Sequence, residues 1–195
     1  MRLWIAKQRY LIDFTLASLL LSCILLAACS PVPQGGKPVG ADFVLQGPTG
    51  PVDSHNFRGK LMLVFFGYVN CPDVCPTSLA AMNEVLSGMT PEERAKIQPI
   101  LISVDPERDT PESLGNYAAY FHPSLIGVTG TPEQIATIAK AFGAGYVRQP
   151  ARSDGSYAVD HSANTYLVGK DGKLVAALPY GAPADDLRAA IRQAL

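Results

Sequence analysis

Residues 61–76 read Leu-Met-Leu-Val-Phe-Phe-Gly-Tyr-Val-Asn-Cys-Pro-Asp-Val-Cys-Pro, a continuous apolar run followed closely by two cysteines. The run at 61–66 is typical of a strand that is buried on both faces. Cys71 and Cys75 are separated by three residues. Two thiols this close in sequence can form a disulfide or bind a soft metal ion. The surrounding sequence must distinguish these two chemistries.

Strand and helix patterns alternate around this stretch. A short hairpin is predicted within residues 43–57, a buried strand at 100–104, a short strand at 125–128, and a hairpin formed by 165–168 and 174–178 with Lys-Asp-Gly at its turn. Apolar residues at helical spacing predict helices near 79–89, 114–121, 135–142 and 187–195. This order predicts an α/β fold with a central mixed sheet flanked by helices. The cysteine pair directly after the first long buried strand makes this predicted fold similar to that of thioredoxin.

Three Thr-Pro pairs mark helix starts, at residues 90–91, 110–111 and 131–132. Threonine is a good N-cap, and proline fits the first helical position. Glu93 and Gln134 stand three residues after the first and third threonines, which predicts a capping box at each of these two helices.

Residues 1–28 have the pattern of a lipoprotein signal peptide. A basic start is followed by an uncharged stretch at 14–28, and Leu-Ala-Ala-Cys at 26–29 resembles the bacterial lipobox, so Cys29 is the expected lipidation site. An uncleaved membrane anchor is the alternative, but the stretch is shorter than the ~20 residues that a spanning helix needs. Both interpretations place the domain outside the cytoplasm and tied to a membrane.

The remaining chain divides into a tether and one domain. Residues 29–41 are rich in proline and glycine without an apolar period, so we expect a tether that precedes a thioredoxin-like domain at 42–195. The formal net charge is −1 and no dense basic run occurs, so nothing indicates nucleic-acid binding. Cys23 would leave with the signal peptide and Cys29 would carry lipid. Cys71 and Cys75 would then be the free thiols of the exported protein, where a pair indicates a disulfide, a redox couple or a metal site.

The cysteine pair is expected at the start of a helix. Unpaired N–H groups and the helix dipole favour thiolate there, so both cysteines should be acidic. Thioredoxin-type oxidoreductases have two residues between their cysteines, whereas this chain has three. Positions i and i+4 of a helix point the same way, so both sulfurs can reach one ion, although a disulfide stays possible.

The expected third ligand is His161. It lies just before the strand at 165–168, in a loop that faces the cysteines in a thioredoxin-like fold. His55 is expected in a solvated loop, and His122 at a helix end where a cation suits the dipole. The stretch 162–165 lacks the proline that thioredoxins carry there, which argues against a disulfide-substrate site. Two thiolates and one imidazole suit copper, as Cu(I) and also as Cu(II). Zinc would need a fourth ligand such as water or Asp73, for which a solvated role is simpler.

The motifs together resemble the Sco/SenC family. They are Phe-Gly-Tyr at 66–68, Cys-Pro-Asp-Val-Cys-Pro at 71–76, Ser-Val-Asp-Pro-Glu-Arg-Asp-Thr-Pro at 103–111 and Asp-His-Ser at 160–162. The resemblance implies a membrane-tethered copper protein of thioredoxin fold whose ligands are Cys71, Cys75 and His161. It also implies that the protein delivers copper to the binuclear centre of cytochrome c oxidase subunit II, or reduces the thiols of that centre. Asn70 stands where a threonine is common in the family.

The main hypothesis is therefore a lipid-anchored, periplasm-facing copper metallochaperone rather than an enzyme with ordinary turnover. The alternative is a thiol–disulfide oxidoreductase that uses Cys71 and Cys75 as its redox pair, and a peroxiredoxin-like peroxide sensor is a third. Expected partners are cytochrome c oxidase subunit II and another periplasmic copper chaperone or thiol reductant. Residues 105–109 are an acidic loop that we expect to be a solvated turn, with contact to the metal site or to a partner as the alternative.

Overall fold

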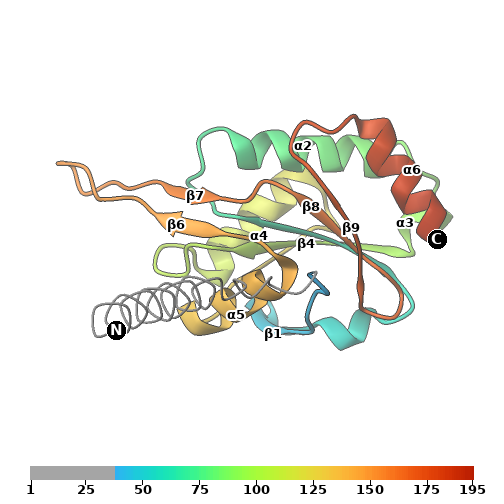
Figure 1. The fold of residues 1–195 in the computed structure, drawn as a ribbon, viewed down its shortest axis with the longest axis horizontal. Helices are drawn as coiled ribbons and strands as arrows, with labels where there is room; N and C mark the ends of the chain where they lie inside the picture. Colours follow the sequence, from blue (N-terminus) through green and yellow to red (C-terminus); the bar gives the residue numbers. More distant parts are fainter. Residues whose placement is uncertain (1–37) are drawn as a thin grey trace, which may run out of the picture. The chain divides into compact units, whose positions relative to one another are not determined.

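The computed structural model of this chain describes residues 38–195, so the predicted signal peptide, Cys29 and most of the predicted tether lie outside the described residues. The elements in chain order are β1 (Val44–Gly47), β2 (Gly50–Asp53), η1 (Ser54–Phe57), β3 (Leu61–Gly67), α2 (Val74–Ser87), α3 (Pro91–Arg94), β4 (Ile97–Ser103), α4 (Pro111–Phe121), β5 (Ile126–Val128), α5 (Pro132–Phe142), β6 (Tyr146–Arg148), β7 (Val159–His161), β8 (Thr165–Val168), β9 (Leu174–Leu178) and α6 (Ala184–Ala194) (Figure 1).

A five-stranded mixed sheet forms the centre of the domain, in the order β5-β4-β3-β8-β9. Strand β3 pairs in parallel with β4 and antiparallel with β8, while β9 pairs antiparallel with β8. All seven residues of β3 are buried, because helices and loops cover both faces of the sheet at its centre. The predicted α/β class, mixed sheet and thioredoxin-like fold are confirmed.

Helices cover the sheet from both sides. Helices α2 and α6 pack against each other on one face, and α5 lies on the opposite one (Figure 1). On the α5 side, Phe142 makes edge-to-face contacts with Phe66 of β3 and Tyr166 of β8, with ring centroids 5.5 and 5.6 Å apart. The contacts among these three rings hold α5 against β3 and β8, the two central strands that lie next to the site in the chain.

The three predicted Thr-Pro helix starts are all present, at α3, α4 and α5. The two predicted capping boxes form, and α4 has a third that was not predicted. There the Ser113 hydroxyl replaces a Glu or Gln side chain and accepts a hydrogen bond from the Thr110 N–H at 3.0 Å. Serine is short, but at N3 it is close enough to reach the N-cap amide.

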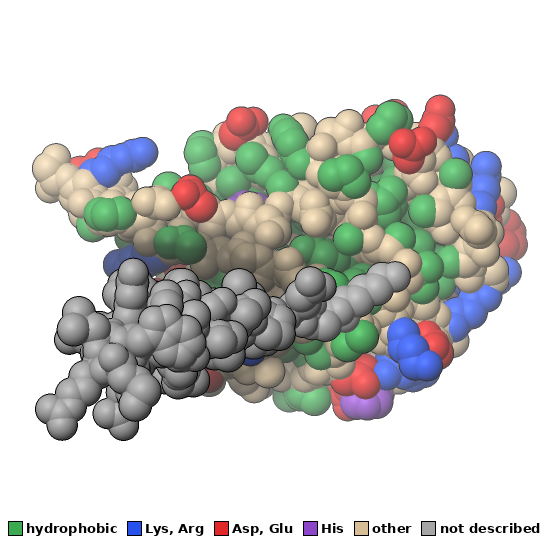
Figure 2. Space-filling view, in the orientation of Figure 1, with side chains coloured by type: hydrophobic (Ala, Val, Ile, Leu, Met, Phe, Trp, Pro, Cys, Tyr) green, Lys and Arg blue, Asp and Glu red, His purple; other side chains and the backbone are tan. Residues whose placement is uncertain are grey.

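The hairpin formed by β6 and β7 was not predicted. It projects from the body of the domain, and basic and acidic side chains mix with apolar ones toward its tip (Figure 2). Its strands are three residues long and are joined by a long connection, so neither strand has a readable apolar period. Within residues 38–195, no helix combines the length and the apolar character needed to cross a membrane.

Candidate metal centre

The two cysteines reach the site from different local structures. Cys75 lies in the first turn of α2, whereas Cys71 lies in the loop before the helix, whose N-cap is Asp73. The expectation that both cysteines share a helical turn is therefore wrong. The backbone at Asp73 is non-helical, and the Cys71 N–H donates to the Tyr68 carbonyl at 3.3 Å, which folds the loop back toward β3. The loop brings the Cys71 sulfur to the helix start without being part of the helix.

Strand β7 brings His161 to the same place. The Nε2 atom of His161 lies 3.2 Å from the Cys75 Sγ and 3.8 Å from the Cys71 Sγ. The three candidate ligand atoms all lie within 4.8 Å of one another. Sequence placed His161 in a loop, but it ends a strand that pairs with β6 through Tyr146. The structure thus brings together the three residues that were predicted as metal ligands.

Burial makes the two thiols unequal. Cys75 is fully buried and Cys71 is half-buried. Loss of solvent raises the pKa of the Cys75 thiol far above its ordinary value, with the neighbouring Cys71 side chain adding to the effect. For Cys75, the expected acidity from the helix start is therefore wrong, because desolvation outweighs the helix dipole. The Cys71 Sγ accepts a hydrogen bond from the Cys75 backbone N–H at 3.4 Å.

His161 is arranged to present a lone pair to the sulfurs. Its Nδ1 lies 3.1 Å from the Ser162 carbonyl oxygen, which can only accept, so this contact favours the tautomer with the proton on Nδ1 and a lone pair on Nε2. Burial lowers the pKa of His161, and a smaller opposing effect comes from its backbone hydrogen bonds. The ring edge also packs against Phe65 and Tyr68, with centroids 6.0 and 5.8 Å away. A neutral imidazole held this way is suited to bind a metal.

The other predicted candidates lie elsewhere. Asp73 is exposed and is not among the clustered ligand atoms. His55 contacts Asp53 and Asp42 at the surface. His122 accepts from the Ser124 N–H at 3.1 Å, and burial lowers its pKa, so the expected cationic role at the helix end is not supported.

The donor set and its spacing fit one soft metal ion. Donors bound to a single ion at about 2.0–2.3 Å lie within roughly 4.6 Å of each other, so the three side chains need only a small inward movement. An open hollow of about 390 Å³ leads to these atoms and is lined by Tyr68, Cys71, Pro72, Asp73, Val74 and residues 158–161. The site is therefore accessible to another molecule from one side.

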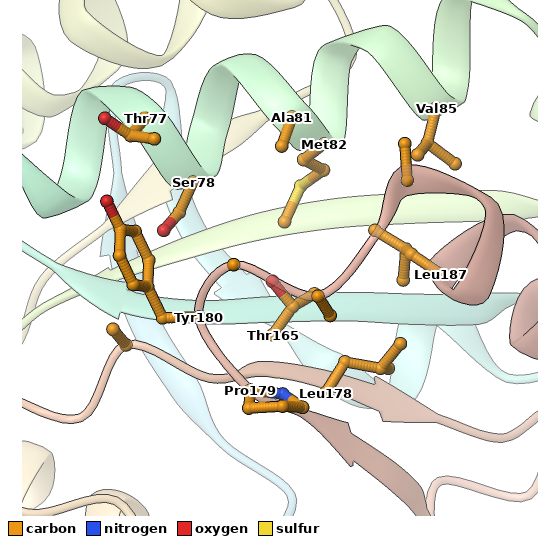
Figure 3. A pocket seen from close by; sticks show the side chains of 14 residues that line it. Thr77, Ser78, Ala81, Met82, Val85, Thr165, Leu178, Pro179, Tyr180 and Leu187 are labelled. Atoms are coloured by element: carbon orange, nitrogen blue, oxygen red, sulfur yellow. The ribbon is translucent and has the colours of Figure 1, made fainter.

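A second hollow lies beside α2, between this helix and the segment that joins β9 to α6. It holds about 90 Å³ and its lining is mostly apolar, including Met82, Leu178 and Leu187 (Figure 3). The Ser78 hydroxyl is buried and has no hydrogen-bond partner among residues 38–195. None of the clustered metal-ligand residues lines this hollow, so it belongs to the helix packing rather than to the site.

Several supporting residues were missed or left open from sequence. Gly67 ends β3 directly beneath the site, and a Cβ there would stand 2.8 Å from the Cys75 Sγ. Asp109 is buried and accepts from the Val69 N–H at 3.1 Å, which holds the loop before Cys71. The expectation of a solvated turn at 105–109 is wrong for Asp105 and Asp109, which are 4% and 3% exposed. A buried carboxylate is not readable from an acidic motif alone.

Comparisons with known proteins agree on one family. The sequence profile of SCO1/SenC matches residues 31–195. The chain is 39% identical over 137 residues to the SCO2-like protein of Rickettsia conorii, covering 69% of this chain and 66% of that one. It is 38% identical over 143 residues to the human mitochondrial SCO1 homolog, covering 72% of this chain and 48% of that one. The chain thus spans about two thirds and about half of the lengths of these relatives.

Solved structures with the same fold include copper-bound ScoI from Bradyrhizobium japonicum and apo Sco1 from Thermus thermophilus. The first is 39% identical with a TM-score of 0.73 and covers 80% of this chain and 99% of that one. The second is 41% identical with a TM-score of 0.74 and covers 82% of this chain and 94% of that one. With its own fold, its Cys-Cys-His cluster and these matches, the chain belongs to the SCO1/SenC family.

Proposed function

We propose that this protein binds copper through Cys71, Cys75 and His161 and delivers it to the binuclear copper centre of cytochrome c oxidase subunit II. The observation that carries the proposal is the convergence of two sulfurs and one imidazole nitrogen within 4.8 Å, with Cys71 and His161 lining an open hollow. Soft sulfur donors stabilise Cu(I), and the imidazole also accommodates Cu(II). The copper-bound relative from Bradyrhizobium japonicum supports the choice of metal.

The unequal burial of the ligands suggests an order for copper transfer. Cys71 and His161 are partly exposed, whereas Cys75 is fully buried. An incoming ligand from the partner would replace Cys71 or His161 first, and Cys75 would release the ion last. Both thiols must be reduced before the ion binds, so the redox state of the pair controls loading.

A second candidate function is thiol–disulfide exchange, favoured by two free thiols whose sulfurs lie within 4.8 Å. The Cys71 thiolate would attack a disulfide of the oxidase copper site and form a mixed disulfide. Cys75 would then attack the Cys71 sulfur and displace the second thiol of the partner. This protein gains one disulfide and loses two electrons and two protons. The partner gains two thiols. The same pair can serve both functions at different times.

We further propose the location and domain plan that the N-terminal sequence predicts. Residues 1–28 would be a lipoprotein signal peptide, Cys29 would carry lipid, and residues 29–41 would tether the thioredoxin-like domain 42–195 on the periplasmic side of a membrane. Metabolic labelling with a radioactive fatty acid checks this plan, since a Cys29→Ser variant should lose the label.

Copper titration distinguishes the two candidate functions. Cu(I) is added to the fully reduced full chain in competition with a chromogenic chelator, comparing the wild type with His161→Ala. We expect one tightly bound ion per chain. Because the variant loses a ligand itself, its affinity should fall by at least the roughly 10- to 100-fold that loss of a ligand's supporting contact costs. His122→Ala is the matched control and should bind as the wild type does. Weak binding that does not depend on His161, with rapid reduction of an oxidised copper-site peptide, would instead establish the oxidoreductase.

A further inference from the structure

The hairpin that carries His161 is fastened to the body of the domain just before β7. Tyr157, Val159 and His161 occupy alternate positions, so they face the same side of the extended chain. The Val159 N–H donates to the Tyr68 hydroxyl at 3.2 Å, and Val159 itself is buried. Tyr157, four residues before His161, is the next residue that contacts the body of the domain.

Arg108 and Asp105 hold Tyr157 from the body of the domain. The guanidinium of Arg108 lies over the Tyr157 ring, 3.6 Å from its centroid, and its Nη1 donates to the Tyr157 carbonyl at 3.0 Å. The Tyr157 hydroxyl donates to Asp105 at 2.8 Å, and Arg108 Nε donates to the other oxygen of that carboxylate at 2.5 Å. These contacts close a ring of three side chains. Asp105 is buried and Arg108 mostly so, which limits the screening of their attraction by solvent.

The same segment also holds the cysteine side of the site. Asp109 Oδ2 accepts from the Val69 N–H at 3.1 Å and from the Ser103 hydroxyl at 2.7 Å. Residues 105–109 therefore contact the loop that leads to Cys71 and the strand that leads to His161. This short segment thus links the two parts of the site.

The use of arginine in this place is specific. Its planar guanidinium stacks on Tyr157 and, at 5.7 Å, also faces the ring of Tyr68, which packs against His161. Its Nη2 is buried without a hydrogen-bond partner among residues 38–195, so stacking rather than hydrogen bonding accounts for that end of the side chain. Lysine would keep the charge but lose the flat stack and the fork of donors.

We infer that Arg108 is a positioning residue, which, clamped to Tyr157, holds His161 over the two cysteine sulfurs. The inference rests on the proposed role of Cys71, Cys75 and His161 as copper ligands. Arg108 contacts Tyr157, Tyr68 and Asp105 rather than the donor atoms, so it would act on the site through the hairpin. Loosening the clamp should move the imidazole and leave the sulfurs near each other, since Asp109 keeps its own contacts.

A double-mutant cycle tests whether Arg108 acts through His161. Arg108→Lys should weaken Cu(I) binding about tenfold, as expected when a supporting contact of a ligand is lost. In the His161→Ala background, the same substitution should change the affinity less than twofold. Arg152→Lys, at the exposed tip of the same hairpin, is the matched control and should leave the affinity unchanged. Tyr157→Phe keeps the stack and loses only the hydroxyl, so its effect should be smaller than that of Arg108→Lys. A loss of equal size in both backgrounds, or none in either, overturns the inference.

A metal-free measurement keeps this inference separate from the proposed function. In the reduced chain without copper, amide hydrogen exchange by NMR should be faster in Arg108→Lys for the Ser162 N–H, which bonds the Gly145 carbonyl at 2.8 Å. Exchange should stay at the wild-type rate in Arg152→Lys. If the wild type fails to bind Cu(I) at all, the proposed function fails, whereas unchanged exchange at residues 159–162 in Arg108→Lys overturns the positioning role by itself.

Discussion

At Gly67 the central sheet lies very close to the site. Its α-carbon faces the buried Cys75 sulfur, and a Cβ there would stand 2.8 Å from that sulfur and 2.9 Å from the Phe65 ring. Neither neighbour can withdraw easily, because both are fully buried in the core. A side chain at this position must displace the ligand, the ring or the strand.

We therefore expect Gly67→Ala to cost about 1–3 kcal/mol of stability, the usual range for overpacking. It should also weaken Cu(I) binding, because the Cys75 sulfur shifts. Urea unfolding and copper competition measure the two effects. Gly88→Ala is the matched control, since the nearest atoms to its Cβ would be at ordinary contact distances of 3.5 and 3.6 Å. Wild-type stability and affinity in Gly67→Ala would contradict this account of the close approach.

Among the secondary-structure elements, α4 depends on a capping box made of two short side chains. Thr110 Oγ1 accepts from the Ser113 N–H at 3.1 Å, and the Ser113 hydroxyl accepts from the Thr110 N–H at 3.0 Å. Helix α4 follows directly after Asp109, so this cap also ends the segment that holds the hairpin and the cysteine loop.

Thr110→Ala should lower the free energy of unfolding by about 1 kcal/mol, since one end of the box is lost. Thr137→Ala is the control, because Thr137 is exposed inside α5 and alanine is the better helix former there. Its stability should be unchanged or slightly higher. Chemical denaturation of both variants measures the difference, and equal losses would show that the cap of α4 has no special role.

For the molecule as a whole, the partly buried imidazole of His161 makes stability depend on pH. Burial lowers the pKa of His161 below its ordinary value of 6.5. As pH falls below about 6.5, the unfolded chain takes up a proton on this side chain, whereas the folded chain resists it. Stability is therefore lost on acidification through that range. His122 contributes with the same sign, since burial lowers its pKa too.

His161→Gln should remove one part of this dependence. In the reduced, metal-free chain, the urea midpoint of the wild type should fall more steeply between pH 7.5 and 5.5 than that of the variant. His122→Asn should show a shallower slope for the same reason, and the double variant should be shallower than either. Parallel slopes for the wild type and His161→Gln would mean that the partly buried imidazole of His161 is no harder to protonate than an exposed one.

Sequence patterns predicted the parts of the fold that depend on local rules. The apolar run of β3, the helix caps at Thr90 and Thr131 and the β8–β9 hairpin are each visible within a few residues. The predicted topology placed His161 opposite the cysteines, and the cluster of ligand atoms agrees with that placement.

Other features depend on contacts between distant residues and have no local pattern. Strands β6 and β7 are too short to show an apolar period, and the hairpin that they form contacts Arg108, which is distant in the sequence. The high pKa of Cys75 comes from burial by surrounding elements, which outweighs the helix start that sequence reveals.

The sequence alone determined which chemistry is available, because residue type sets donor softness and local spacing sets strands, caps and the cysteine pair. Tertiary structure decided how these donors are presented: which thiol is buried, which imidazole nitrogen faces the sulfurs, and how Arg108 and Tyr157 hold the hairpin. Desolvation and side-chain stacking arise only when segments far apart in the chain are packed together, so neither could be read from the order of residues.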